Sequence, residues 1–316
     1  MDPSMKAMIL AAGLGTRLRP LTDTRPKALV ELAGRTLLEI TLTRLRAFGI
    51  AEVIVNVHHF ADQVIAYLKS HNNFGMRIEI SREEILLDTG GGLKKATWFF
   101  LEDPTRLDEP FLLHNVDVIS TIDFARMLQF HKEHRALATL AVQSRKSSRP
   151  LLFNNDLQLC GRRAGGTATS APSRGSGAMN LGYAPQSTAT QNPSATAPPT
   201  AETTNDCHSE RSAESAFSEL QPGSSSLATR HSPLPQVPEP SPLQSLAFSG
   251  IHLISPRLLP LLTEEGVFSI IPSYLRLAAH GQKILAFRSD QYYWRDLGRP
   301  SDLAQAALDS QQNAFL

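Results

Sequence analysis

Two glycines and two basic side chains near the start of the chain form the pattern that points most directly to chemistry. Gly13 and Gly15 follow an apolar run over residues 7–12, which predicts a buried strand that ends in a tight turn. Glycines at the carboxyl end of a strand let backbone N–H groups point at an anion. Arg17 and Lys27 add fixed positive charge nearby. The stretch therefore predicts a polyphosphate site.

Two better-known phosphate loops do not fit this stretch. The dinucleotide-binding turn requires Gly-x-Gly-x-x-Gly, and Leu18 stands where its third glycine would be. The P-loop requires Gly-x-x-x-x-Gly-Lys followed by Ser or Thr, and the chain lacks that string. An NAD-dependent oxidoreductase would also need a catalytic Tyr-x-x-x-Lys, which is absent as well. This class of enzyme is therefore disfavoured.

The full string GLGTRLRPLTDTRPKALVEL resembles the signature of the sugar-1-phosphate nucleotidyltransferases. It departs from that signature at Ala28, where many members have a second proline. The resemblance implies that Arg17 stabilises the β- and γ-phosphates of a nucleoside triphosphate and the departing pyrophosphate. It implies that Lys27 neutralises charge near the α-phosphate, so that Arg17 and Lys27 are the candidate catalytic residues. It further implies nucleotide-binding backbone donors at Gly13, Gly15 and Thr16.

Two aspartates from different parts of the chain are candidate ligands for Mg²⁺. The attacking oxygen of a sugar 1-phosphate already belongs to a phosphate dianion, so the obstacle is the approach of one anion to another. Mg²⁺ binds one or two carboxylates plus phosphate oxygens and water. Asp117 follows an apolar run, Asp296 lies in a Trp-x-Asp-x-Gly string, and both resemble the family's metal-binding aspartates. The resemblance also implies sugar-phosphate contacts at Asn115, Gly250 and Asp296.

A run of three glycines is the candidate site for the nucleobase and ribose. The string LDTGGGLKKA over residues 87–96 precedes a predicted helix. Glycines there permit close approach of a flat ring and leave helix N-terminal donors free. The family uses a comparable loop for the base, and the alternative is a flexible turn before a helix. The expected nucleotide-binding residues are Thr89, Gly90, Gly91 and Gly92.

Three strings narrow the resemblance within the family: MKAMILAAG, LDTGGG and FSGIHLISP. They resemble the N-acetylmuramate-1-phosphate uridylyltransferases of cell-wall recycling, which implies UTP and N-acetylmuramate 1-phosphate as substrates. Mannose- and heptose-1-phosphate guanylyltransferases have similar strings and stay as alternatives, as does a non-catalytic nucleotide-sensing scaffold. One departure is QSRKSSRP at residues 143–150, where many members have Glu-Lys-Pro and its lysine contacts the sugar phosphate. Lys146 and Arg149 are the candidate replacements.

Bulk composition excludes several classes of protein. The 316 residues carry a formal net charge of +1, and 41% of them are hydrophobic. That suffices for a sizeable core and provides no strong field for nucleic acid or membranes. No apolar run approaches the ~18 to 20 residues of a membrane span, and residues 1–6 leave no room for a signal peptide. We therefore expect a cytoplasmic enzyme, monomeric or a small homo-oligomer, without nucleic-acid or membrane partners.

The composition changes sharply after Cys160. Residues 162–245 are rich in Ser, Thr, Ala and Pro and lack a sustained apolar period, so they cannot bury enough surface to offset the entropy of ordering. They are interpreted as a disordered insertion. The expected organisation is a nucleotidyltransferase domain whose first part spans residues 1–161 and whose completion spans residues 246–316.

Strand and helix patterns alternate outside this insertion. Alternation of this kind predicts an α/β, Rossmann-like fold with a mostly parallel sheet and helices on both faces. Ligands in such sheets collect at the carboxyl ends of the strands, where the glycine turn, Asn115 and Asp117 are predicted to lie. Strands are predicted at residues 7–12, 52–57, 76–80, 111–115, 136–142, 247–254 and 283–288. Helices are predicted at residues 36–48, 61–70, 93–101, 124–134, 269–280 and 301–310.

Overall fold

The structure is a computed structural model that describes residues 5–163 and 242–312. These residues belong to one compact unit, although they come from two separate parts of the chain. The predicted disordered insertion lies almost entirely outside the described residues. At its edges the prediction is wrong, because Arg162 ends one strand and Gln244 begins another. These end residues pair with a neighbouring strand, which their composition did not reveal.

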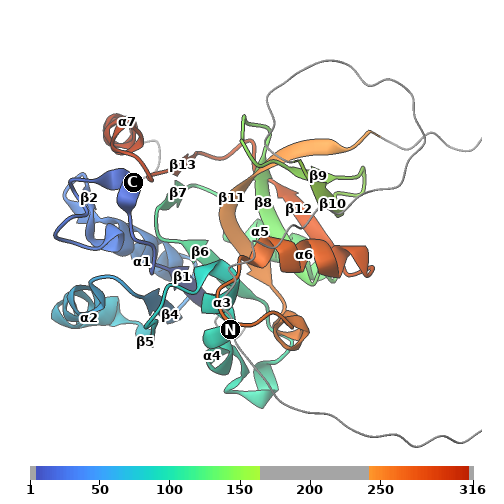
Figure 1. The fold of residues 1–316 in the computed structure, drawn as a ribbon, viewed down its shortest axis with the longest axis horizontal. Coiled ribbons are helices and arrows are strands. Elements are labelled where there is room, and N and C mark those ends of the chain that lie inside the picture. Colours follow the sequence, from blue (N-terminus) through green and yellow to red (C-terminus); the bar gives the residue numbers. More distant parts are fainter. Residues whose placement is uncertain (1–4, 164–241, 313–316) are drawn as a thin grey trace, which may run out of the picture. The chain divides into compact units, whose positions relative to one another are not determined.

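A nine-stranded mixed sheet forms the centre of the unit (Figure 1). Seven strands follow the order β10-β9-β11-β6-β1-β4-β5, and β8 and β12 extend the sheet beside β11. The pairs β1–β4, β1–β6, β4–β5 and β8–β12 are parallel. The bounds are β1 Lys6–Leu10, β4 Glu52–Val57, β5 Arg77–Arg82, β6 Phe111–Asn115, β8 Ala138–Gln143, β9 Leu151–Phe153, β10 Leu159–Arg162, β11 Gln244–Ile254 and β12 Ile284–Arg288.

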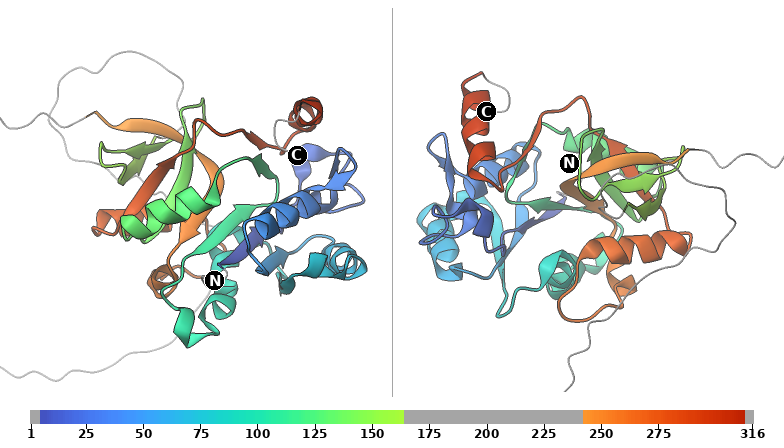
Figure 2. Two further views of the ribbon diagram at one scale, coloured as in Figure 1. Left: turned by 180° about the vertical axis from the view of Figure 1, so that it is seen from behind. Right: turned by 45° about the horizontal axis from the view of Figure 1, so that its top comes forward.

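Helices cover both faces of this sheet (Figures 1 and 2). Alternate residues of β1 divide between two apolar clusters, since Ala7 and Ile9 pack with α1, α2 and α5, whereas Met8 packs with α3, α4 and α6. The predicted α/β fold class is confirmed. The helices are α1 Leu37–Ala47, α2 Ala61–Ser70, α3 Asp88–Lys95, α4 Thr97–Leu101, α5 Phe124–Glu133, α6 Ile270–Ala279 and α7 Pro300–Gln311. None of the helices in the described ranges is long and apolar enough to cross a bilayer.

Strand β11 joins β6 to β8 and β9 within the sheet. It runs antiparallel to β6, β8 and β9, so the sheet is more mixed than the alternating pattern predicted. Its residues 251–254 pair with β6, and Asn115 is the last residue of β6. Gly250 on β11 therefore lies beside Asn115 at the sheet edge where ligands are expected.

Two short ribbons, which the sequence patterns did not predict, complete the fold. Strand β2 (Glu31–Leu32) pairs with β3 (Arg35–Thr36). Strand β7 (Val118–Ser120) pairs with β13 (Trp294–Asp296), and both runs are only three residues long. The second ribbon attaches the C-terminal part of the chain directly after Asp117.

Candidate active site

The glycine turn after β1 is held by side chains from other elements. The backbone nitrogens of Ala11 and Ala12 donate to Asn56 Oδ1 at 2.7 and 3.3 Å. Gly15 has a φ of +65°, and a β-carbon there would lie 2.8 Å from Thr22 Cγ2. Thr22 Oγ1 donates to the Gly15 carbonyl at 2.9 Å, which closes the turn. Both conformation and space therefore require glycine at position 15.

Lys27 reaches the predicted metal aspartate. It begins a 3₁₀ turn, Lys27–Leu29, after the extended Pro26. Its Nζ donates to Asp117 Oδ2, and the two side chains are only 11% and 14% exposed. This buried ion pair neutralises one carboxylate of the site before any ligand binds.

Asp296 lies next to Asp117 because β13 pairs with β7. The Leu297 backbone nitrogen donates to the Asp117 carbonyl at 2.7 Å, and Asp296 is opposite Val118 in the ribbon. Burial raises the pKa of Asp296, and the Asp117 carboxylate raises it further, although Lys27 and Arg17 lower it in part. Two adjacent carboxylates that repel each other fit the number that Mg²⁺ takes from a protein. The described residues contain no group of three or more His, Cys, Asp or Glu side chains suited to a metal.

Arg17 lies on the other side of Asp296. A β-carbon on Gly298 would lie 2.7 Å from both Arg17 Nη2 and Asp296 Oδ1, so the guanidinium and the carboxylate share the space above this glycine. The Gly298 backbone nitrogen donates to Asp296 Oδ1 at 2.7 Å. Arg17 is exposed and makes no ion pair within the described part of the chain. Its guanidinium is therefore available to an anion.

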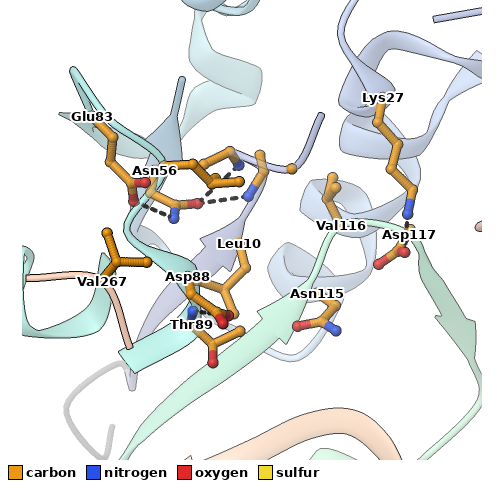
Figure 3. A pocket seen from close by; sticks show the side chains of 14 residues that line it. Leu10, Lys27, Asn56, Glu83, Asp88, Thr89, Asn115, Val116, Asp117 and Val267 are labelled. Atoms are coloured by element: carbon orange, nitrogen blue, oxygen red, sulfur yellow. Dashed lines mark hydrogen bonds and ion pairs between the residues drawn. The ribbon is translucent and has the colours of Figure 1, made fainter. Parts of the chain in front are cut away.

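A first cavity of about 360 Å³ lies between the glycine turn and α3 (Figure 3). Lys27 and Asp117 line one side, and Asp88 and Thr89 line the other. Val267, which is 60% exposed, adds an apolar side chain to the cavity wall. The remaining lining residues are Leu10, Ala11, Ala12, Gly13, Asn56, Glu83, Leu86, Asn115 and Val116.

A second cavity of about 590 Å³ shares Asn115 with the first. It contains Arg17 and Asp296, whereas Lys27 and Asp117 line the first cavity. Gly250 also lines it. This residue has a φ of +73°, and a β-carbon there would lie 2.8 Å from Asn115 Nδ2. The four charged residues thus lie where two cavities meet.

The glycine run differs from its prediction. Helix α3 begins at Asp88, so the three glycines lie inside its first turns instead of in a loop before it. The backbone nitrogens of Gly90 and Gly91 donate to the Phe268 carbonyl at 2.9 and 3.1 Å, so the expectation of free donors is wrong. A β-carbon on Gly90 would lie 2.3 Å from the Phe268 ring. Of the four predicted residues only Thr89 lines the cavity.

The structure contains a buried polar network that the sequence patterns did not reveal. Asn56 Nδ2 donates to Glu83 Oε1 at 2.8 Å, and Glu83 Oε2 accepts from the Leu87 backbone nitrogen at 3.0 Å. Asn56 and Glu83 are each 3% exposed. Since Asn56 also holds the glycine turn, the network joins that turn to the start of α3 (Figure 3). The available signal was an asparagine inside the apolar strand EVIVNV.

The stretch that replaces the family's Glu-Lys-Pro string contributes arginines. Arg145 and Arg149 line the second cavity, and Lys146 does not. The Arg145 guanidinium lies 3.7 Å from the centre of the Trp294 ring, and its Nη2 donates to the Phe248 carbonyl at 2.7 Å. The candidate replacement Arg149 is therefore at the cavity, together with Arg145, which the sequence interpretation did not single out.

Residues 6–151 match the family model described as nucleotidyl transferase. The match covers slightly less than half of the chain. The chain is 52% identical over 101 residues to N-acetylmuramate alpha-1-phosphate uridylyltransferase of Caulobacter vibrioides. The aligned residues make up 31% of this chain and 42% of that protein. The chain is also 39% identical over 139 residues to mannose-1-phosphate guanyltransferase of Aspergillus fumigatus, and the aligned residues make up 44% of this chain and 37% of that protein. The chain thus spans less than half the length of these two relatives.

Solved structures share the fold of this chain. A crystal structure of UDP-glucose pyrophosphorylase complexed with UDP-glucose superimposes with a TM-score of 0.63 at 14% identity, over 98% of this chain and 99% of that one. HddC from Yersinia pseudotuberculosis complexed with GMP-PN superimposes with a TM-score of 0.61 at 16% identity, over 97% of this chain and 100% of that one. At these identities the likeness concerns the fold alone.

Proposed function

We propose that the chain is a sugar-1-phosphate nucleotidyltransferase, which joins a nucleoside triphosphate and a sugar 1-phosphate to give a nucleotide sugar and pyrophosphate. One observation carries the proposal: Arg17, Lys27, Asp117 and Asp296 converge where two cavities meet at Asn115. A transfer between two anions requires cations at the junction of a donor site and an acceptor site.

The first cavity is the proposed nucleoside triphosphate site, and the second is the acceptor site. A phosphate oxygen of the sugar 1-phosphate attacks the α-phosphorus, and the bond from that phosphorus to the pyrophosphate oxygen breaks. No proton must be removed, because the attacking oxygen is already anionic. Lys27 compensates charge at the α-phosphate, and Arg17, which reaches the junction from the second cavity, binds the leaving pyrophosphate. Asn115 and Gly250 form the wall that orients the sugar phosphate.

Asp117 and Asp296 are the residues that would hold Mg²⁺. The bound ion would supply positive charge that offsets the repulsion between the two substrates and between the two carboxylates. Lys27, which pairs with Asp117 in the structure, would then lie beside both the ion and the α-phosphate.

For the substrates, we propose UTP and N-acetylmuramate 1-phosphate, which places the chain in cell-wall recycling. The 52% identity to the Caulobacter uridylyltransferase supports this choice. Similarity to mannose-1-phosphate guanyltransferases makes GTP with mannose or heptose 1-phosphate the competing choice. We further propose a cytoplasmic enzyme, monomeric or a small homo-oligomer, whose catalytic domain is divided by the insertion.

Pyrophosphate release by the purified full chain with Mg²⁺ tests the proposal. UTP, GTP, dTTP and CTP are each combined with the 1-phosphates of N-acetylmuramate, N-acetylglucosamine, glucose, mannose and heptose. We expect turnover with UTP and N-acetylmuramate 1-phosphate and none after Asp117→Asn. Turnover only with GTP and mannose or heptose 1-phosphate would overturn the substrate choice, and no turnover by folded protein would overturn the transferase proposal.

A further inference from the structure

The second cavity has more positive charge than a single phosphate needs. Four arginines line it, Arg17, Arg145, Arg149 and Arg162, and Asp296 is the only carboxylate among its lining residues. Arg17 lies beside Asp296 at the junction with the first cavity. Arg145, Arg149 and Arg162 line the same cavity.

Two of these arginines are adjacent through backbone pairing. Strand β10 pairs antiparallel with β9 so that Arg162 is opposite Leu151, and the Arg163 backbone nitrogen donates to the Pro150 carbonyl at 3.0 Å. Arg149 precedes these residues directly, so Arg149 and Arg162 lie on neighbouring segments of one rim. Both side chains are exposed.

Neither Arg149 nor Arg162 has a carboxylate partner within residues 5–163 and 242–312, whereas half of the other arginines there do. Arg145, by contrast, is held against Trp294 and the Phe248 carbonyl, and thus forms part of the wall. Neutral sugar hydroxyls do not require guanidinium groups, whereas a planar carboxylate matches their paired N–H donors.

We propose that Arg149 and Arg162 bind a second acidic group on the acceptor, a carboxylate attached to the sugar ring away from its 1-phosphate. The two arginines thereby select acidic sugar 1-phosphates over neutral ones. The inference rests on the proposed transferase function and deepens it, since it assigns the residues that distinguish N-acetylmuramate 1-phosphate from N-acetylglucosamine 1-phosphate. These two compounds differ only in the lactyl ether that carries the carboxylate.

The test compares these two acceptors in the full chain and in Arg149→Gln, Arg162→Gln and the double variant. The wild-type kcat/KM with UTP should favour the acidic acceptor, and each substitution should reduce that preference about tenfold or more, as expected for a lost charge-assisted hydrogen bond. In Arg162→Gln the value for the neutral acceptor should stay within about twofold, because Arg162 has no assigned contact to the 1-phosphate. Arg163→Gln is the matched control, because Arg163 is exposed and adjacent but does not line the cavity.

Calorimetric titration of both acceptors, with and without Mg²⁺ and a non-hydrolysable UTP analogue, gives a readout that does not depend on turnover. Tighter binding of the acidic acceptor, lost in the double variant, would support the inference even in an inactive protein. Equal binding or equal turnover of both acceptors by the wild type would overturn it. Parallel losses for both acceptors in the arginine variants would also overturn it, while leaving the transferase proposal intact.

Discussion

Asp296 lies beside Asp117, and the Asp117 charge contributes to the raised pKa of Asp296. The contact exists because the Leu297 backbone nitrogen donates to the Asp117 carbonyl at 2.7 Å. Two neighbouring carboxylates that are both partly buried repel each other, and this repulsion destabilises the protein unless a cation lies between them. The pair therefore connects metal binding, catalysis and stability.

Removal of the Asp296 carboxylate should lower activity without lowering stability. We expect Asp296→Asn to reduce kcat/KM by roughly 10²- to 10³-fold, the range typical of a lost electrostatic contact at a reacting centre. Without Mg²⁺ its Tm should equal or exceed that of the wild type, because the repulsion from Asp117 is gone. Mg²⁺ should raise the Tm of the wild type and not that of the variant. Asp156→Asn, an exposed turn substitution, serves as the control, and full activity of Asp296→Asn would contradict the assigned role.

A methyl group at position 298 should displace Arg17. The added β-carbon of Gly298→Ala would lie 2.7 Å from both Arg17 Nη2 and Asp296 Oδ1, so the guanidinium must move away from the carboxylate beside it. A misplacement on this scale costs about 100-fold in catalysis. Steady-state kinetics should show this loss, while circular dichroism shows an unchanged fold. In Gly161→Ala the new carbon would lie 3.6 Å from Leu152, an ordinary contact, so that variant should keep its activity. Equal effects of the two substitutions would argue against the Arg17 role.

The network of Asn56 and Glu83 should position the glycine turn. Asn56→Ala leaves the Ala11 backbone nitrogen and Glu83 Oε1 without partners, which should destabilise the protein by roughly 1 to 3 kcal/mol. Because the turn borders the first cavity, the KM for the nucleoside triphosphate should rise more than kcat falls. Chemical denaturation and kinetics at varied UTP measure the two effects. Asn155→Ala, in an exposed turn, is the control, and an unchanged KM in Asn56→Ala would refute the positioning role.

Buried histidines should make the fold sensitive to mild acid. Burial lowers the pKa of His114 and His131 to about 4 and that of His252 to about 3, from an ordinary 6.5. In the unfolded chain these rings take up protons as the pH falls below 6.5, but in the folded chain they stay neutral until about 4. The free energy of unfolding should therefore fall by about 1.4 kcal/mol per pH unit for each histidine in this window.

Urea denaturation between pH 7 and pH 4.5 measures this dependence. His131→Gln should reduce the slope, because one buried ring is removed and the glutamine amide can still bond to Thr139. His280→Gln should leave it unchanged, since His280 is exposed. A stability that does not depend on pH over this range would contradict the buried, neutral state of these histidines.

Local patterns predicted the elements whose order depends on nearby residues. The strands at residues 52–57 and 111–115 and the helix at residues 61–70 have the predicted bounds. The spacing of apolar residues suffices to predict these elements, because the helix buries one apolar face against the core and the strands bury nearly all of their residues. The glycine at position 15 was likewise predictable, since a strand followed by Gly-x-Gly requires a turn.

Prediction failed where the deciding partner is distant in the chain. The first turns of α3 contain glycines, which disfavour helix, yet the Phe268 carbonyl accepts hydrogen bonds from two of their amides. The three-residue strand β13 has no periodic signal and exists because it pairs with β7. Asn56 and Glu83 form one network only because β4 and β5 are neighbours in the sheet.

The sequence by itself determined which chemistry was possible: a phosphate-binding turn, two basic residues and two aspartates in strings that resemble one family. Only the tertiary structure decided that Asp117 and Asp296 are adjacent, that Gly90 and Gly91 pack against protein, and that Arg149 and Arg162 share a cavity rim. The physical reason is that residue types and their spacing describe local conformation and charge. Adjacency between remote segments depends on strand pairing and core packing, which involve the whole chain at once.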